Sequence, residues 1–330
     1  MSIKVAINGT GRIGLCAARI VSQRSDVELV AMNTTTDIDT LVHLIRFDSV
    51  HRGFEVEKKD DTTISIGNSK NIKIFSDRDP AKVDFGSVGA KVVLECTGVF
   101  RSSDKARAHI HGGVEKVVIS APASDDTPTF VMGVNSDKYS GQSIVSNASC
   151  TTNCLAPIAK VLNDSFGIES GLMTTVHSYT NDQNILDVKH KDIRRARAAA
   201  MNMIPTSTGA AKAIGLVLPE LQGKMGGFAI RVPTPDVSVV DLSVTLHKSV
   251  SVDSINSAML EASKGSLKEY LEVDEHKRVS SDFIGSALSA IFVPDFTTVV
   301  GDRSAKVLAW YDNEWGYSNR LVDLAVHIGV

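Results

Sequence analysis

The feature that most constrains the fold is a glycine motif close to the N-terminus. Residues 8–14 read Asn-Gly-Thr-Gly-Arg-Ile-Gly and lie between an apolar stretch, residues 3–7, and a helical pattern. Strand, G-x-G-x-x-G and helix in this order form the dinucleotide-binding fingerprint. Gly9 permits the tight turn, Gly11 lets the backbone approach a pyrophosphate, and Gly14 allows close packing of helix on strand. The sequence therefore predicts a Rossmann-type unit that begins at the first strand.

Further apolar runs in the first half of the chain are typical of strands buried on both faces of a parallel sheet. The expected strands are residues 27–32, 91–96 and 116–120, with a hairpin formed by 62–66 and 72–75. Ligands of open parallel sheets bind beyond the carboxyl ends of the strands. Thr97 and Ser120 follow two of these ends, and we expect both to line a cofactor crevice.

Length and composition set the broad class. A chain of 330 residues with 43% hydrophobic and 22% charged residues fits two globular domains. The net charge of −3 gives no field that would recruit nucleic acid or a membrane surface. The four cysteines are not spaced as a disulfide framework, and the chain opens in a strand pattern rather than a signal peptide. We therefore expect a cytoplasmic location without nucleic-acid or membrane partners.

One cysteine lies in an unusually polar setting. Residues 146–154 read Ser-Asn-Ala-Ser-Cys-Thr-Thr-Asn-Cys, and a helix-prone run follows directly. This order predicts a helix that begins at or near Cys150. Free N–H groups and the backbone dipole at a helix N-terminus stabilise a thiolate, so we expect a lowered pKa and a nucleophilic Cys150. The alternative is a buried structural thiol, which is the common fate of a free cysteine.

The second half of the chain has a different pattern. Several strand-like runs follow one another without intervening helices, which favours a mostly antiparallel sheet. A polar stretch of about 20 residues after position 178 is long for a compact domain, and such loops are often functional. The predicted fold is α/β, with a doubly wound parallel sheet in a dinucleotide-binding domain, 1–149, and an α+β catalytic domain, 150–315. The helical tail, 316–330, is expected to return to the first domain.

His177 ends a half-buried strand pattern and is the candidate base for Cys150. A lone histidine is more often structural, so the spacing alone leaves both interpretations open. Combined with the glycine motif, a thiol and an imidazole indicate oxidation of an aldehyde through a thioester.

These motifs together resemble the glyceraldehyde-3-phosphate dehydrogenase family over essentially the whole chain. The similar segments are residues 8–14, 48–51, 147–154, 177–180, 194–197, 231–235 and 310–317. The resemblance implies that Cys150 attacks glyceraldehyde 3-phosphate, that His177 takes the thiol proton, and that inorganic phosphate releases 1,3-bisphosphoglycerate. It also implies a homotetramer in which the loop of about 178–201 lies near a neighbouring subunit's cofactor.

The same resemblance assigns binding residues. Thr180 and Arg231 would hold one phosphate, and the attacking phosphate would be held by Ser149, Thr151, Thr208 and Gly209. The dinucleotide, NAD or NADP, would be contacted by Gly9, Gly11, Arg12, Ile13, Gly14, Thr34, Arg78, Thr97, Ser120 and Asn313, with Asn313 reaching the carboxamide.

Five positions depart from the family pattern. Thr10 replaces an aromatic residue and Leu15 an arginine, from which we expect only altered packing. Thr34 replaces the acid of NAD-preferring members, and residues 188–189, Val-Lys, replace Leu-Pro. Loss of an acid and gain of Lys189 predict use of NADP, alone or with NAD. The alternatives are that the threonines cap the helix that begins near Asp37, and that Lys189 points into solvent.

Other functions fit less well. An erythrose-4-phosphate dehydrogenase of the same family tends to lack the motifs that this chain keeps at 178–181 and 206–209. A thiol hydrolase needs no dinucleotide fold, and a silent nucleotide-binding protein needs no nucleophile. Zinc at Cys150 and Cys154 would lack further cysteines nearby, so no metal is expected and Cys154 is interpreted as structural.

Overall fold

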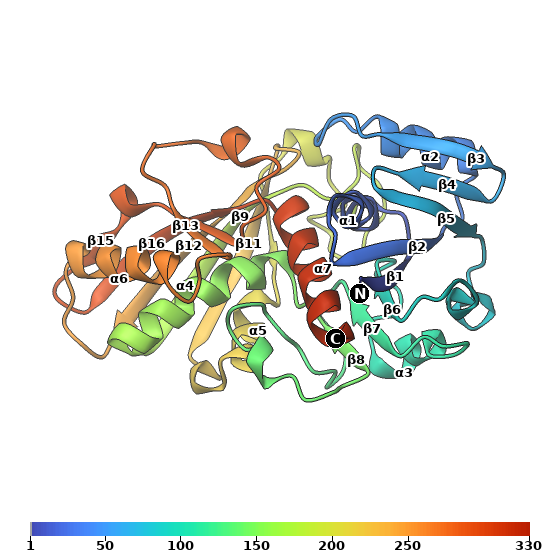
Figure 1. The fold of residues 1–330 in the computed structure, drawn as a ribbon. Helices are drawn as coiled ribbons and strands as arrows, with labels where there is room; N and C mark the ends of the chain where they lie inside the picture. The colour runs from blue at the N-terminus through green and yellow to red at the C-terminus, as the bar shows by residue number, and fades with distance from the viewer. Residues whose placement is uncertain (1) are drawn as a thin grey trace. The chain divides into compact units, whose positions relative to one another are not determined.

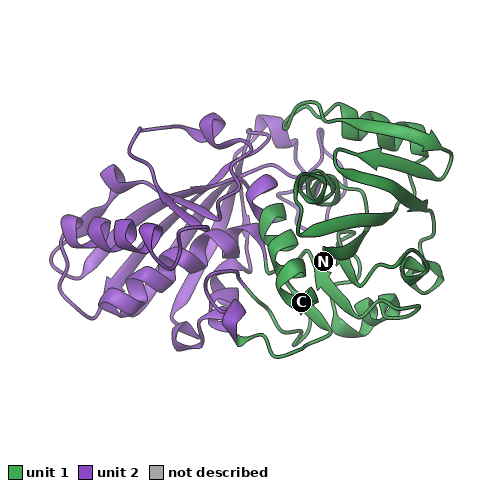
Figure 2. Ribbon diagram, in the orientation of Figure 1, with its two compact units in different colours: residues 1–130, 138–148, 318–330 green, residues 131–137, 149–317 purple. Residues whose placement is uncertain are grey.

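The structure is a computed structural model that describes residues 2–330, and the chain forms two compact units (Figure 2). Unit 1 consists of residues up to 130 together with 138–148 and 318–330, and unit 2 consists of 131–137 and 149–317. Within residues 2–330, no helix has both the length and the apolar character needed to cross a membrane.

Unit 1 is built on an eight-stranded sheet with the order β3-β4-β5-β2-β1-β6-β7-β8 (Figure 1). The strands are β1 (Ile3–Asn8), β2 (Val27–Asn33), β3 (Val56–Asp60), β4 (Thr63–Ile66), β5 (Ser69–Phe75), β6 (Val92–Glu95), β7 (Lys116–Ile119) and β8 (Ile144–Ser146). The six strands from β5 to β8 in this order are parallel, and β3, β4 and β5 form an antiparallel meander. The predicted hairpin is thus confirmed as β4 and β5.

Helices cover the parallel strands of unit 1, which explains why those strands are apolar on both faces. They are α1 (Arg12–Gln23), α2 (Ile38–Arg46), α3 (Ser103–Ala106) and the part of α7 (Trp315–Gly329) that lies in this unit. The α1 helix packs on β1 and β2, and an ion pair between Arg24 and Asp323 ties its C-terminal end to α7. The side chain of Asp37 caps α2 by accepting the N–H of Thr40 at 2.9 Å, so the cap is this acid and not the threonines before it.

The sheet of unit 2 has the order β10-β11-β9-β12-β16-β14-β13, and β15 pairs with β16. Its strands are β9 (Ile168–Ser178), β10 (Ile204–Ser207), β11 (Met225–Val232), β12 (Ser238–Leu246), β13 (Leu271–Val273), β14 (Ala290–Phe292), β15 (Thr298–Val300) and β16 (Ser304–Tyr311). Only the β9–β11 and β13–β14 pairs are parallel, so the sheet is mixed and mostly antiparallel, as predicted.

Three helices contact this sheet: α4 (Cys150–Phe166), α5 (Ala210–Val217) and α6 (Val252–Lys264). Along β9, residues alternate between the two faces of the sheet. Met173, Thr175 and His177 are buried, whereas the side chain of Leu172 on the opposite face is 71% exposed. The sheet therefore has one face that carries buried polar residues and one face that is open.

The long polar segment after β9 is irregular up to a short 3₁₀ turn, Ala199–Met201. Ion pairs within the segment hold it in place. Arg195 pairs with Asp182, and Arg197 Nε lies 2.7 Å from Asp187 Oδ2. The expected long loop is therefore a folded segment in this structure.

Candidate active site

Cys150 is the first residue of α4, as the sequence predicts. Ser149 is the N-cap, and its Oγ accepts the N–H of Thr152 at 3.0 Å. The residue before the cap, Ala148, has a φ of +56°, which is unusual for a residue with a side chain and marks a sharp turn. Local chemistry thus places a thiol at the positive end of a 17-residue helix.

His177 lies at the end of β9 on the helix-covered face, and its Nε2 is 3.5 Å from Cys150 Sγ. Its Nδ1 donates to the carbonyl oxygen of Ser178 at 2.7 Å. Because Nδ1 carries the proton in this bond, Nε2 presents a lone pair to the thiol. Burial and the nearby Arg231 charge lower the pKa of His177 to about 3, so the imidazole is neutral at physiological pH.

The expected lowering of the Cys150 pKa is wrong for this structure. Burial raises the pKa of the thiol, and this effect outweighs the Arg231 charge and the N–H groups of Thr151 and Cys150, which lower it. Helix position alone does not decide the protonation state, because the desolvation free energy of the thiolate exceeds the stabilisation that the helix dipole provides. The resting pair is therefore a thiol next to a neutral base.

Arg231 brings a positive charge to the same face. Strands β9 and β11 pair Arg231 with His177, and Arg231 Nη1 donates to Ser178 O and to Thr180 Oγ1, each at 3.2 Å. Within the described residues, Arg231 Nε is buried without a hydrogen-bond partner. A buried guanidinium with an unused donor suits a phosphate or carboxylate oxygen.

A buried tyrosine, which the sequence analysis did not assign, connects the nucleophile helix to the sheet. Tyr311 Oη lies 2.9 Å from Thr151 Oγ1 and 2.8 Å from Thr175 Oγ1. Its ring meets the ring of His177 at 5.9 Å and an angle of 78°. The hydroxyl of Thr151 thus bonds Tyr311 in this structure.

Asn313 is buried and held by two hydroxyls. Its Oδ1 accepts from Ser178 Oγ at 2.8 Å and from Ser238 Oγ at 2.6 Å. Both bonds engage the oxygen, which leaves the Nδ2 group as a donor. This orientation suits recognition of a carbonyl oxygen, such as that of a carboxamide.

The remaining residues predicted for the second phosphate lie where α5 begins. Gly209 is the N-cap of α5, and Thr208 Oγ1 accepts the N–H of Ala210 at 3.2 Å.

Arg195 is a further cation of this unit that could not be assigned from the sequence. Its charge acts on both Arg231 and His177 and lowers their pKa values, after the larger effect of burial.

In unit 1, a crevice of about 600 Å³ lies at the carboxyl ends of the strands, as predicted. Its wall includes Gly9, Thr34, Arg78 and Thr97. Gly9 has a φ of +99°, which a side chain would strain.

The other two glycines of the motif have different surroundings. A Cβ on Gly14 would lie 2.0 Å from Gly9 O, whereas a Cβ on Gly11 would meet nothing within 4 Å. The turn at the start of α1 is thus closely packed at Gly14 and has free space next to Gly11. The residues present fit a dinucleotide pyrophosphate.

Thr10 and Thr34 are joined in this crevice. Their Oγ1 atoms are 2.6 Å apart, and Thr34 Oγ1 also accepts the N–H of Thr36 at 3.1 Å. The expectation that Thr10 alters only packing is therefore wrong, because the two departures from the family pattern form one hydrogen-bonded pair.

The other predicted cofactor residues of unit 1 have varied partners. The Arg12 side chain is paired with Asp48, with Nη2 3.2 Å from Oδ1. Ile13 follows it in the first turn of α1, and Ser120 donates its N–H to Glu95 O at 3.0 Å. Arg78 is exposed and lines the crevice.

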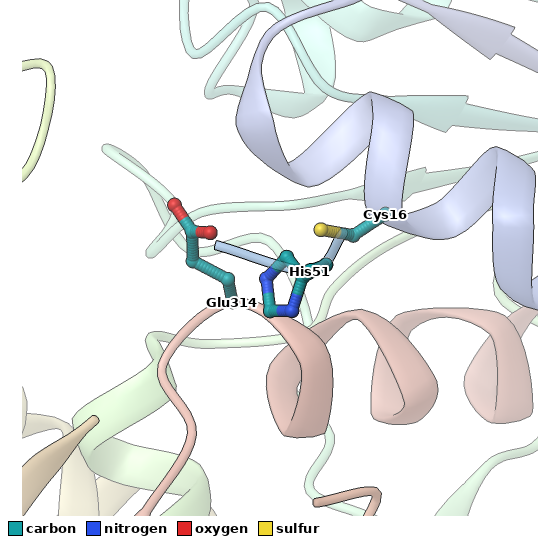
Figure 3. Close-up of side chains that lie close together, drawn as sticks. All are labelled: Cys16, His51 and Glu314. Atoms are coloured by element: carbon teal, nitrogen blue, oxygen red, sulfur yellow. The ribbon is translucent and has the colours of Figure 1, made fainter. Parts of the chain in front are cut away.

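The cysteines have different surroundings. Cys154 is fully buried, with Sγ 3.8 Å from Ala309 O. Figure 3 shows Cys16, on α1, and His51, both of unit 1, together with Glu314, which belongs to unit 2. Neither Cys150 nor Cys154 belongs to a cluster of three metal-ligating side chains within residues 2–330.

A Rossmann-type crevice and a thiol–imidazole pair with a buried arginine define a class: pyridine-nucleotide-dependent oxidoreductases that use a cysteine nucleophile. Family comparisons make the class specific. The NAD-binding domain of glyceraldehyde 3-phosphate dehydrogenase matches residues 3–103, and the C-terminal domain of the same enzyme matches residues 149–313. The chain belongs to the glyceraldehyde-3-phosphate dehydrogenase family.

Similar proteins cover the chain from end to end. Glyceraldehyde-3-phosphate dehydrogenase of Priestia megaterium is 53% identical over 330 residues, which are 99% of this chain and 98% of the relative. Glyceraldehyde-3-phosphate dehydrogenase 1 of Bacillus subtilis is 52% identical with the same coverage. The enzyme of Geobacillus stearothermophilus is 51% identical, again over 99% of this chain and 98% of the relative.

Proposed function

We propose that this chain oxidises glyceraldehyde 3-phosphate to 1,3-bisphosphoglycerate with NAD and inorganic phosphate, in glycolysis and gluconeogenesis. The observation that carries the proposal is the distance of 3.5 Å between Cys150 Sγ and His177 Nε2, in a chain of this family. NAD, when bound, supplies the hydride acceptor. We assign its binding to the domain formed by 1–149 with the helix 316–330, and catalysis to residues 150–315.

In the first step, Cys150 Sγ bonds to the aldehyde carbon while the thiol proton passes to His177 Nε2. The carbonyl oxygen becomes the hydroxyl of a thiohemiacetal, and the protonated imidazole provides its hydrogen. Loss of hydride and of the hydroxyl proton, which His177 accepts again, leaves an acyl-thioester on Cys150. A phosphate oxygen then attacks the acyl carbon, the carbon–sulfur bond breaks, and the sulfur leaves as a thiolate that His177 reprotonates.

The anion sites follow from charge and donors. Arg231 and Thr180, which are hydrogen-bonded to each other, would hold one phosphate group. Ser149 and Thr151 at the start of α4, with Thr208 and Gly209 at the start of α5, would hold the other. The buried Arg231 Nε supports this assignment, because it is a donor that awaits an acceptor.

Turnover with and without phosphate tests the proposal. With glyceraldehyde 3-phosphate but without phosphate or arsenate, the wild-type protein should reduce NAD for the first turnover only. Addition of phosphate or arsenate should allow NAD reduction to continue. Cys150→Ser should bind NAD normally and show no turnover. Activity that survives this substitution, or that prefers erythrose 4-phosphate, would contradict the assignment, and NAD binding without any turnover would support a silent binding protein.

We infer that the cofactor crevice also accepts NADP. The crevice wall includes Thr34 and the exposed Arg78, and a 2′-phosphate needs hydrogen-bond donors and positive charge. Lys189 is exposed on the long loop and would add a further charge in an assembled protein. The ratio of kcat/KM for NADP and NAD tests this: Thr34→Asp should shift it toward NAD by about tenfold or more, because a carboxylate repels phosphate. A strong wild-type preference for NAD would end the NADP proposal.

We infer that the chain forms a homotetramer in the cytoplasm. The open face of the unit 2 sheet exposes Leu172, Phe228 and Val300 and is hollowed by a cavity of about 760 Å³. Large apolar side chains that are exposed on a sheet face rimmed by polar residues are typical of interfaces. Light scattering should give four times the chain mass of 35.3 kDa. Leu172→Lys should lower that mass, whereas a monomeric wild-type protein would contradict the proposal.

A further inference from the structure

A buried polar cluster lies beneath the cofactor crevice of unit 1, and the mechanism above makes no use of it. Its centre is the carboxylate of Glu95, the last residue of β6, with His109 beside it. Each of the two residues is only 1% exposed. A buried acid with this many polar neighbours requires an account, because an unpaired charge would destabilise the fold.

The carboxylate of Glu95 receives four donors. Oε2 accepts from Asn8 Nδ2 at 2.6 Å and from His109 Nε2 at 2.9 Å. Oε1 accepts the N–H of Thr97 at 2.8 Å and also the Thr97 hydroxyl. Two donors on each oxygen satisfy the carboxylate group, which is thereby held in one orientation.

The cluster extends to the neighbouring strands. Asn8 ends β1 and Asn33 ends β2, and Asn33 Nδ2 donates to Asn8 Oδ1 at 2.7 Å. Asn33 also binds the backbone of Asp77, with Nδ2 2.8 Å from its carbonyl oxygen and Oδ1 3.0 Å from its nitrogen. The register of the sheet places the last residues of β2, β1 and β6 side by side.

Each of these strand ends leads into a loop of the crevice wall. Gly9–Gly11 follow Asn8, residues 34–36 follow Asn33, and Thr97 follows Glu95 by two residues. Asp77 and Arg78 belong to the same wall. His109 adds a contact of its own, since its ring meets that of Phe100, another wall residue, at 6.0 Å and 78°.

We propose that Glu95 and His109 are positioning residues for cofactor binding, because their hydrogen bonds fix the loops that form the dinucleotide crevice. The inference rests on the proposed function in assigning that crevice to the dinucleotide. It goes further by naming two buried residues that touch no cofactor and yet set its affinity. When the loops are already held in the binding-competent conformation, the apparent affinity for the ligand is not reduced by a population of other conformations.

The test is the isosteric substitution Glu95→Gln. An amide offers one acceptor oxygen and brings a donor to a place where two donors already point, so the wall loops lose their common anchor. The NAD dissociation constant, measured by calorimetry, should rise about tenfold or more. The KM for NAD should rise with it, while kcat and the KM for the aldehyde substrate should stay within about twofold.

Two comparisons separate positioning from stability. Ile64→Ala empties a buried site on β4, which contributes no residue to the crevice wall, and should lower the thermal midpoint without changing the NAD dissociation constant. His109→Gln keeps a donor for Glu95 and should bind NAD more tightly than His109→Leu, which keeps none. If Glu95→Gln does not fold, the two His109 variants carry the test.

Two results would overturn the inference. The first is an unchanged NAD affinity in Glu95→Gln, or in both His109→Gln and His109→Leu. The second is a loss of NAD affinity in Ile64→Ala that equals the loss in Glu95→Gln. Both leave the proposed function intact. A wild-type protein that binds no NAD would instead refute the proposed function, and the inference with it.

Discussion

Tyr311→Phe is the most informative single substitution in unit 2. The change removes one oxygen and keeps the ring that meets His177. It breaks the bonds of 2.9 Å and 2.8 Å from Tyr311 Oη to Thr151 and Thr175, and leaves two buried hydroxyls without that partner. At about 1 kcal/mol for each bond, we expect a loss of about 2 kcal/mol. A unit of this size shifts its thermal midpoint by about 2–4 °C for each kcal/mol, so the midpoint should fall by about 4–8 °C.

Thr175→Val is the partner variant in a double-mutant cycle, because it removes one of the two bonds from the other side. Calorimetry of both single variants and the double variant should give a coupling energy of about 0.5–1 kcal/mol for this pair. The kcat should fall several-fold in Tyr311→Phe, since Thr151 adjoins Cys150 at the start of α4. A thermal midpoint equal to that of the wild type, or strict additivity of the two substitutions, would refute the reasoning.

Three further predictions concern the glycine turn, the nucleophile and acid stability. Gly11→Ala should keep the wild-type thermal midpoint of the apo protein but weaken NAD binding. Gly14→Ala should lower both the thermal midpoint and the NAD affinity, because its Cβ would lie 2.0 Å from a backbone oxygen, whereas a Cβ on Gly11 meets nothing within 4 Å. Calorimetry of the two variants checks this, and equal midpoints would contradict it. Arg231→Gln should slow alkylation of Cys150 by iodoacetamide at pH 7, because the Arg231 charge lowers the thiol pKa. A faster reaction at pH 7 would contradict the assigned electrostatics. Burial alone would raise the pKa of Asp48, but Arg12 and the N–H groups of His51 and Val50 lower it to about 2. The stabilisation is therefore complete above the ordinary aspartate pKa and is lost as the pH falls toward 2, so thermal midpoints of Asp48→Asn should depend less on pH between 4 and 2 than those of the wild type.

The elements that could be predicted from the sequence are those specified by local chemistry. The strand, glycine turn and helix at the N-terminus follow from neighbouring residues, and so does the helix that begins at Cys150 behind its serine cap. Short strands such as β10 and β13, with four and three residues, were not predicted, because so few residues show no periodicity.

The parts of the site that could not be predicted are long-range. Tyr311 bonds Thr151 across 160 positions of sequence, and Thr175 across 136. The pKa of Cys150 depends on how deeply the folded chain buries the sulfur, and no helix-end rule contains that quantity. The Thr10–Thr34 pair became visible only when the register of β1 and β2 was known, although both residues stood out as departures from the family pattern.

The hydrogen bond from His177 Nδ1 to the carbonyl oxygen of Ser178 has a consequence for proton transfer. A carboxylate in that position, as in the serine protease triad, would stabilise the imidazolium and let the proton rest there. A neutral carbonyl raises the pKa of His177 only slightly, and burial together with the nearby Arg231 charge outweighs this effect and lowers the pKa to about 3. Any proton that the ring accepts is thus soon returned, and a residue with this single backbone anchor can serve both the capture of the aldehyde and the departure of the sulfur within one turnover.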